Sequence, residues 1–310
     1  SGWNFKEKKE LFFKGRWEFY PNKFIHPSNI YGEEANEKPI YLQVPSLWTS
    51  KKNKEISDLK STGYGTYILK LKGLKIGEHF YINTGRYSSA VHGYLINGGD
   101  YNSIFKFGRV GKTFKEEIPQ ITEDKIRFFA RSSQVILLIH SSSFHYRDGG
   151  ILQPPSLLKN KNDMWTYLNI LIQGVALIMA FYHLGLFVNR PDDKASLLFS
   201  LFMLNVFLYN FVRNDIWSFL DPSKFLFALV IKTEYICLTL MPVFVNGFLR
   251  YLFQNSRFFQ IVFKCLLVPS VIFFFIITFL PTQTFTKGIF LIPIQICVLI
   301  SAILIIVGNF

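Results

Sequence analysis

One apolar stretch constrains the fold of this chain more than any other feature. Residues 169–188 contain no side chain that is ionised at neutral pH, and they belong to an apolar run over 165–188. A helix rises about 1.5 Å per residue, so ~20 such residues cross a bilayer core of about 30 Å. The sequence therefore predicts a membrane span here, with a polar domain before it and more membrane segments after it.

Four further apolar segments follow this span. They cover about 195–212, 225–252, 260–280 and 289–307, and short polar loops separate them. Short connections make neighbouring helices antiparallel. We therefore expect residues 165–310 to form an all-α transmembrane bundle of five helices. The loops after the first and third spans carry more Lys and Arg than the others, which indicates that they face the cytoplasm.

The first half of the chain has the pattern of an all-β domain. Short runs rich in Tyr, Phe, Ile and Val are separated by clusters of Gly, Asn, Pro and Lys, which is typical of an antiparallel sandwich or jelly roll. We expect this ectodomain over residues 3–150 and an extended connector over 151–164, because Pro154 and Pro155 disfavour both ladder and helix. The expected strands are 16–20, 40–44, 66–71, 79–83, 90–96 and 134–141.

Charge and the chain ends narrow the functional classes. Residues 1–164 hold 25 of the 34 Lys and Arg and 16 of the 21 Asp and Glu. The basic residues are scattered and do not form a basic, aromatic tract, so we expect no nucleic-acid binding. The chain starts at Ser1 without an apolar signal segment and stops at Phe310, within or just past a span. We therefore expect it to be a fragment of a longer protein.

No motif of a catalytic site is visible. The sequence contains no HExxH, GxSxG, P-loop or CxxC pattern, so we expect no catalytic residue and no cofactor in this chain. The nearest cluster is His140, His145, Arg147 and Asp148. A metal would need ligands converging at about 2.0–2.2 Å, and the positive charge of Arg147 opposes this, so no metal site is predicted.

The segment FHYRDGG, residues 144–150, is the best candidate for a ligand-binding loop. Arg147 offers a fork of donors to hydroxyls or a carboxylate, and Asp148 accepts hydroxyl donors. Aromatic faces can stack on a sugar ring. The alternative is structural: the glycines make a turn, and Arg147 pairs with Asp148 or a carbonyl. The candidate ligand residues are Trp48, Tyr64, Arg86, His145, Tyr146, Arg147 and Asp148, of which Trp48 also suits a core anchor and Arg86 an internal partner.

Among the polar side chains within the predicted spans, three are candidates for contacts between helices. Ionised groups inside a bilayer usually face the bundle or a wet cavity. Lys232 and Glu234 either reach outward as interfacial anchors or make polar contacts that couple helices, and both interpretations stay open. His183 suits an interhelical hydrogen bond. We also expect Glu116 and Glu117 to lie in a solvated turn, which leaves no paired carboxylates for a membrane-anchored glycan enzyme.

Several stretches resemble one bacterial family. Residues 181–215 and 232–253 resemble the first three helices of bacterial seven-transmembrane receptors with diverse intracellular signalling modules. Six segments are similar to the jelly-roll, galactose-binding-like ectodomain of such receptors, which itself resembles a sugar-binding domain of some glycoside hydrolases. These segments are GRWEFY (15–20), VPSLW (44–48), GYGTYILKL (63–71), GRYSSAVHGYLING (85–98), GRVGKTFKEEIP (108–119) and SSFHYRDGGI (142–151).

The resemblance implies a multi-domain membrane protein that acts as a sensory receptor. Its ectodomain would lie in the periplasm, next to the cytoplasmic membrane, and bind a small ligand, with a carbohydrate as the leading candidate. A cytoplasmic cyclase, kinase or phosphatase, which this chain lacks together with two of the seven helices, would give the output and a route to a homodimer. The alternative is a transporter or channel whose ectodomain gathers substrate, because polar residues and prolines within spans also suit transport.

Overall fold

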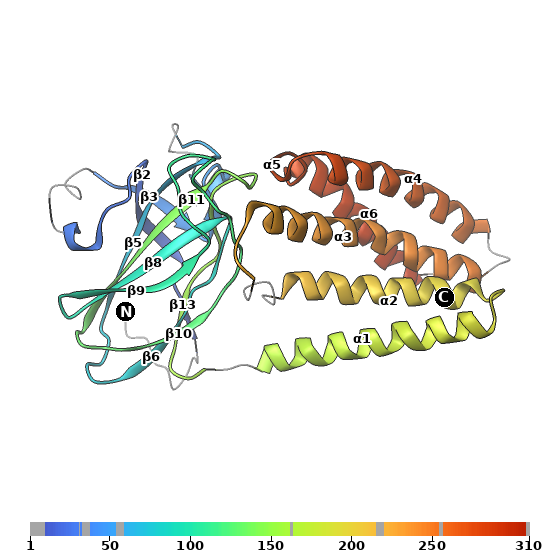
Figure 1. Ribbon diagram of the computed structural model, residues 1–310, viewed down its shortest axis with the longest axis horizontal. Coiled ribbons are helices and arrows are strands. Elements are labelled where there is room, and N and C mark those ends of the chain that lie inside the picture. The colour runs from blue at the N-terminus through green and yellow to red at the C-terminus, as the bar shows by residue number, and fades with distance from the viewer. Residues whose placement is uncertain are drawn as a thin grey trace. The chain divides into compact units, whose positions relative to one another are not determined.

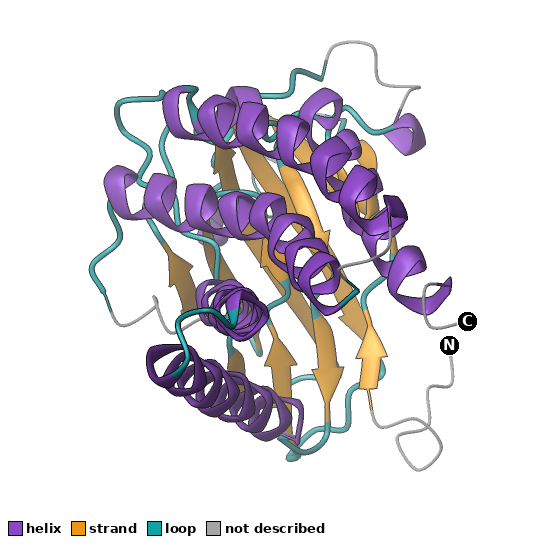
Figure 2. Cartoon of the chain, turned by 90° about the vertical axis from the view of Figure 1, so that its right-hand side faces the viewer, coloured by secondary structure: helices purple, strands orange, loops and turns teal. Residues whose placement is uncertain are grey.

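The structure is a computed structural model that describes residues 10–30, 32, 38–53, 59–161, 164–214, 220–253 and 257–307. The chain forms two compact units. The first comprises Ser1–Asn162 together with Leu220–Phe227, and the second comprises Asp163–Phe219 together with Ala228–Phe310. Strands make up the first unit and helices the second (Figure 1, Figure 2), as the sequence predicts.

Three antiparallel sheets build the β unit. A six-stranded sheet has the order β3 (Ile40–Val44), β2 (Gly15–Pro21), β5 (Gly63–Lys72), β11 (Gln134–Ser143), β8 (Ala90–Asn97), β9 (Asp100–Phe107). A four-stranded sheet has the order β1 (Glu10–Phe12), β13 (Ser156–Leu158), β6 (His79–Asn83), β10 (Lys125–Phe129). A small third sheet has the order β4 (Ser46–Leu47), β12 (Gly150–Gln153), β7 (Arg86–Tyr87).

The main core lies between the two large sheets. Trp17, Tyr67 and Leu137 from the six-stranded sheet pack in one cluster with Ile82 and Leu157 from the four-stranded sheet. Alternate side chains of a strand point to opposite faces, so each strand contributes every second residue to this cluster. The sheets therefore form a sandwich held by burial of the two facing apolar surfaces.

Strand β11 is buried on both faces. Val135, Leu137 and Ile139 belong to the main core, whereas Ile136 and Leu138 belong to a second apolar cluster on the other face of the six-stranded sheet. The segment 22–30 between β2 and β3 covers this second cluster. A strand covered on both sides needs a continuous apolar run, which explains the sequence VILLI in place of an alternating pattern.

All six predicted strands are present, as β2, β3, β5, β6, β8 and β11. Among the described residues, seven further strands were not predicted; several, such as β4 and β7, have only two or three residues, and β9 is largely polar. Residues 150–158, expected mostly as an extended connector, contain β12 and β13. Pro154 and Pro155 lie between these two strands, where no ladder hydrogen bond is needed.

The helical unit follows the apolar segments closely. Its helices are α1 (Met164–Asn189), α2 (Lys194–Arg213), α3 (Lys224–Leu252), α4 (Arg257–Phe279), α5 (Thr282–Phe285) and α6 (Gly288–Val307). Within the described residues, α1 to α4 are long and apolar enough to cross a membrane. The fifth predicted span coincides with α6, whose apolar stretch Gly288–Ile300 is shorter than the four spans before it.

Polar side chains connect the helices of this unit. The Asp193 carboxylate accepts hydrogen bonds from the Ser196 amide (3.1 Å) and hydroxyl (2.6 Å) and caps α2. Ser200 of α2 donates to the Ala180 carbonyl of α1 (2.8 Å), and Asn205 of α2 donates to the Cys237 carbonyl of α3 (2.9 Å). Such interhelical hydrogen bonds support packing where lipid supplies no hydrophobic driving force between helices.

Candidate functional site: a buried carboxylate at one end of the sandwich

The loop between β9 and β10 is closed by its own backbone. Arg109 and Ile118 exchange two hydrogen bonds, of 2.8 and 3.0 Å between amide and carbonyl. Gly108 opens the loop with φ 68°, and a Cβ on it would lie 2.1 Å from the Ile118 carbonyl oxygen. Only glycine fits both the left-handed backbone and this close approach. Glu117 directly precedes Ile118, and the closed loop directs its side chain into the sandwich.

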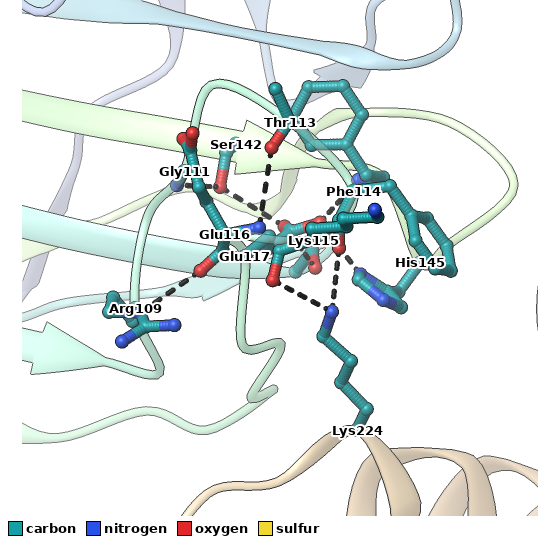
Figure 3. A network of polar contacts seen from close by, with 12 residues as sticks. Arg109, Gly111, Thr113, Phe114, Lys115, Glu116, Glu117, Ser142, His145 and Lys224 are labelled. Atoms are coloured by element: carbon teal, nitrogen blue, oxygen red, sulfur yellow. Dashed lines mark hydrogen bonds and ion pairs between the residues drawn. The ribbon is translucent and has the colours of Figure 1, made fainter.

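Glu117 is fully buried, with 0% of its surface exposed. Its carboxylate accepts hydrogen bonds from the Ser89 hydroxyl (2.7 Å), the Ser142 hydroxyl (3.1 Å) and the Phe144 amide (2.6 Å). The Nδ1 atom of His145 lies 3.0 Å from the same group (Figure 3). The expected solvated turn at Glu116–Glu117 is therefore wrong for Glu117. A buried carboxylate is tolerated only with several donors, and these residues supply them.

His145 connects this carboxylate to the surface of the loop. An ionised carboxylate can only accept, so the hydrogen bond requires a proton on His145 Nδ1. The ring of Phe114 stacks on the imidazole with centroids 4.0 Å apart. Phe114 is 52% exposed, so it is held in place by stacking on His145 and not by deep burial. The polar core at the end of β11 is thus linked to the tip of the loop.

Lys224 completes this network within the first unit. Its ammonium donates to the carbonyls of Phe114 (2.8 Å) and Lys115 (3.0 Å) and lies 5.1 Å from the centre of the Phe114 ring. Lys224 is the first residue of α3, which has 29 residues. A helix of that length extends over about 43 Å and exceeds a bilayer core of about 30 Å. Its first turn can therefore belong to the β unit.

Trp48, a predicted ligand residue, lies in the core with 2% of its surface exposed. Its indole donates to the Tyr67 hydroxyl (2.7 Å), and a Cβ added at Gly149 would lie 2.2 Å from its ring. The glycine of the FHYRDGG loop is thus required by the close approach of Trp48. Of the two alternatives drawn from the sequence, the core anchor describes the position of Trp48.

Asp148 holds the same loop in place. It is 6% exposed and accepts hydrogen bonds from the Thr49 amide (3.3 Å) and the Thr49 hydroxyl. Burial raises the pKa of Asp148 above its ordinary value, and the Thr49 hydrogen bonds oppose this shift. Further backbone bonds join Gly149 to Ser61 and Trp48. The loop 144–150 is therefore fixed against the loop that contains Trp48 and Thr49.

Of the remaining predicted ligand residues, His145 and Tyr146 are buried and the other three are half-buried. The guanidinium of Arg147 lies 5.8 Å from the ring centre of Tyr146, which is 8% exposed, and Arg147 itself is half-buried. Tyr64 is half-buried and packs on Phe24 with ring centroids 4.9 Å apart, and Arg86 is half-buried in β7. The structure brings His145, Tyr146, Arg147 and Asp148 into one loop beside Trp48. Their role in ligand binding stays a prediction.

The polar residues of the predicted spans contact neighbouring helices. Lys232 of α3 donates to the Thr278 carbonyl of α4 (2.7 Å). Glu234 of α3 lies 3.9 Å from the Arg213 guanidinium of α2. The His183 ring of α1 packs on Phe199 of α2, with centroids 4.4 Å apart. Lys232 and Glu234 thus connect α3 to two different helices, whereas a role in signalling stays a prediction.

Sequence reasoning missed Glu117 and Lys224. The partners of Glu117 lie 25 to 28 residues away along the chain, and Lys224 lies 110 residues from Phe114. The periodicity of a local sequence cannot predict contacts between residues so far apart along the chain. The available signal was the placement of KEE directly before Ile118–Pro119, an apolar pair that can enter a core. Among the described residues, no group of three His, Cys, Asp or Glu is arranged to hold a metal ion.

Solved structures similar to this chain include a family 2 β-galacturonidase and two β-glucuronidases. The β-galacturonidase from Eisenbergiella tayi shares 11% identity over 49% of this chain, with a TM-score of 0.32. The β-glucuronidases from Faecalibacterium prausnitzii (12% identity, 48% of this chain, TM-score 0.32) and Ruminococcus gnavus (11%, 49%, 0.33) are comparable. The matched parts cover 25%, 31% and 30% of these enzymes, so this chain spans a quarter to a third of their length.

No curated protein matches the sequence. The helical region gives a different result: the model of the family described as 7TM diverse intracellular signalling matches residues 165–309. These residues begin in α1 and run past the end of α6, and they contain the interhelical contacts described above. The membrane region of this chain, residues 165–309, is therefore similar to the 7TM diverse intracellular signalling family.

Proposed function

We propose that this chain is the sensing and membrane part of a signalling receptor. The β unit binds a small molecule, with a carbohydrate as the leading candidate. The helical bundle transmits the bound state to a cytoplasmic cyclase, kinase or phosphatase. The observation that carries this proposal is the family match over 165–309 in a chain whose described residues between 10 and 161 form a β-sandwich in a unit of its own. The β unit lies on the periplasmic side of the cytoplasmic membrane, and dimerisation occurs through the output module.

A ligand can signal only if it binds two arrangements of the protein with different affinity. The Glu117 network supports a route for this difference. It extends from Ser142 in β11, through Glu117, His145 and Phe114, to Lys224 at the start of α3. A ligand that moves the loop 144–150 acts directly on His145, which belongs to that loop.

The half-buried residues of this end are better ligand candidates than the buried ones. Trp48 and Asp148 already hold internal partners in Tyr67 and Thr49. Arg147, Tyr64 and Arg86 keep part of their surface accessible. A guanidinium fork recognises a carboxylate or a pair of hydroxyls, which suits a sugar or a sugar acid. We therefore assign Arg147 the main polar contact with the ligand.

A thermal-shift panel on the chain in lipid nanodiscs tests this assignment. Neutral sugars and uronic acids are compared, because a carboxylate-specific response separates the two ligand classes. The variant Arg147→Gln is expected to weaken binding of the identified ligand at least about tenfold, because it loses a charge-assisted contact. Arg127→Gln, at an exposed position of β10, is the matched control. Unchanged affinity in Arg147→Gln, with normal melting, would remove Arg147 from the site.

The receptor function itself is tested on the full-length protein with its output domain. Addition of the identified ligand is expected to change the activity of that domain in membranes. A ligand that binds but never alters output, and that instead crosses the bilayer of proteoliposomes, would favour the transporter alternative. Flux and output are measured on the same preparation, so that loss of protein during reconstitution does not imitate either result.

A further inference from the structure

The segment 22–30, which we call the strap, covers the outer face of the six-stranded sheet. Ile25 is 1% exposed and Ile30 is 8% exposed, and both pack in the cluster formed by Ile68, Ile136 and Leu138. These last three side chains come from β5 and β11. Without the strap, this apolar face would be open to solvent, which soluble domains generally avoid.

Two polar anchors fasten the strap to the sheet. The Thr66 hydroxyl of β5 accepts from the Ile25 amide (3.0 Å) and donates to the Lys23 carbonyl (2.8 Å). The Nε2 atom of His140 in β11 lies 2.8 Å from the Ile25 carbonyl. A carbonyl only accepts, so neutral His140 carries its proton on Nε2. The ring of Phe24 packs on the His140 imidazole with centroids 5.0 Å apart.

Titratable groups surround His140 from each neighbouring element. On β8, Tyr94 packs against His140 with ring centroids 5.2 Å apart, and its hydroxyl lies 3.0 Å from His92 Nδ1. On the strap, His26 lies 2.7 Å from the Ser28 hydroxyl. Lys106 of β9 acts electrostatically on His92, and Tyr64 of β5 packs on Phe24. The titratable groups that act electrostatically on His140 are His92 and His26. When either is protonated, it repels a proton on His140.

Burial lowers the pKa of His140 to about 4, the hydrogen bond to Ile25 opposes this shift, and His92 and His26 lower the pKa further. The unfolded or released segment would titrate near the ordinary value of 6.5. The released form thus binds more protons between these values, so acid favours release. The contribution of neutral His140 to the stability of the closed strap is fully present above pH 6.5 and is lost as the pH falls toward 4.

We propose that the strap is an acid-released cover. Protonation places an imidazolium among His26, His92 and apolar side chains, and hydration of that charge requires the strap to leave. Its departure exposes the apolar face formed by Ile68, Ile136 and Leu138 while the sandwich core, on the opposite face of the sheet, stays packed. The strap would respond to protons whether or not the chain is a receptor.

Hydrogen exchange read by mass spectrometry on the whole chain in nanodiscs tests this proposal. Exchange rates are corrected for the intrinsic effect of pH on amide chemistry. Opening of the strap is expected to rise by up to about tenfold per pH unit between about 6.5 and about 4, while amides of β5 and β11 stay protected. Exposure of the strap only together with the whole sandwich would overturn the proposal.

The variant His140→Gln isolates the trigger. Its side-chain amide can still donate to the Ile25 carbonyl but cannot be protonated, so the strap is expected to stay protected in acid. His79→Gln is the control, because His79 lies on β6 of the other large sheet and packs on Phe129. An acid response of His140→Gln equal to that of the wild type would exclude His140.

A second variant keeps the proposal testable if His140→Gln does not fold. Thr66→Val has a similar shape but lacks the hydroxyl that holds Lys23 and Ile25. A strap with one anchor fewer needs less acid to open, so its opening curve is expected to move to higher pH. An opening curve of Thr66→Val identical to that of the wild type would contradict the fastening that we describe.

Discussion

At the scale of single residues, Glu117 shows how context decides the role of an acidic side chain. Glu116 and Glu117 are neighbours, but only Glu117 is buried. The Glu116 carboxylate stays near the surface and accepts from the Lys112 amide (2.8 Å). Because Glu117 has four donors and no contact with water, its charge is compensated by the protein alone. Removal of that charge therefore tests the network directly.

We predict that Glu117→Gln lowers the free energy of unfolding by about 3 kcal/mol, because one amide hydrogen then faces donors in a buried site. Glu116→Gln, the matched control, is expected to change it by less than about 0.5 kcal/mol, as an exposed substitution does. Thermal and urea unfolding of the two variants, followed by tryptophan fluorescence of the β unit, give the comparison. Equal stability of both variants would contradict the assigned role of Glu117.

At the scale of elements, the loop 108–118 and the start of α3 form one structural feature. Lys224 contacts two backbone carbonyls and one ring of that loop. Lys224 makes these contacts with its side chain, whereas Lys115 contributes only its backbone carbonyl oxygen. Replacement of each lysine by methionine removes one positive charge in both cases, but removes the contact in only one.

We predict that Lys224→Met increases amide exchange in residues 109–118, because the loop loses two charge-assisted hydrogen bonds and a cation–π contact. The effect on global stability should be below about 1 kcal/mol, since the contact is exposed. Lys115→Met is expected to leave exchange unchanged. Equal exchange in the loop for both variants and the wild type would show that Lys224 does not hold it.

The elements also show what a sequence can and cannot reveal. Short runs rich in aromatic and β-branched residues predict six strands, and long apolar segments predict the positions of five helices, because both are properties of consecutive residues. Strands as short as β4 and β7 have too few residues to show a period. The buried Glu117 and the contact of Lys224 depend on partners distant in sequence. The FHYRDGG segment follows β11, and its close packing against Trp48, about 100 residues earlier in the chain, could not be predicted from local sequence.

At the scale of the whole molecule, a receptor must couple its two units thermodynamically. If a ligand shifts the bundle, a substitution that shifts the bundle must also change the apparent affinity for the ligand, because coupling is reciprocal. Helix α3 is the best place to test this, since Lys232 connects it to α4 and Glu234 connects it to α2. A substitution there alters the bundle without touching the β unit.

If the proposed function is right, Lys232→Met, which loses the hydrogen bond to the Thr278 carbonyl, is predicted to shift both the basal output and the apparent ligand affinity of the full-length protein. Coupling free energies between two sites are typically 1–3 kcal/mol, so the ligand affinity is expected to change by about 5- to 150-fold. Lys264→Met, at an exposed position of α4, is the control and should change neither quantity. Output and affinity are measured on the same membranes. A changed basal output with an unchanged affinity would mean that the β unit and the bundle are not coupled through α3, and the sensing role of the β unit would then have to be abandoned.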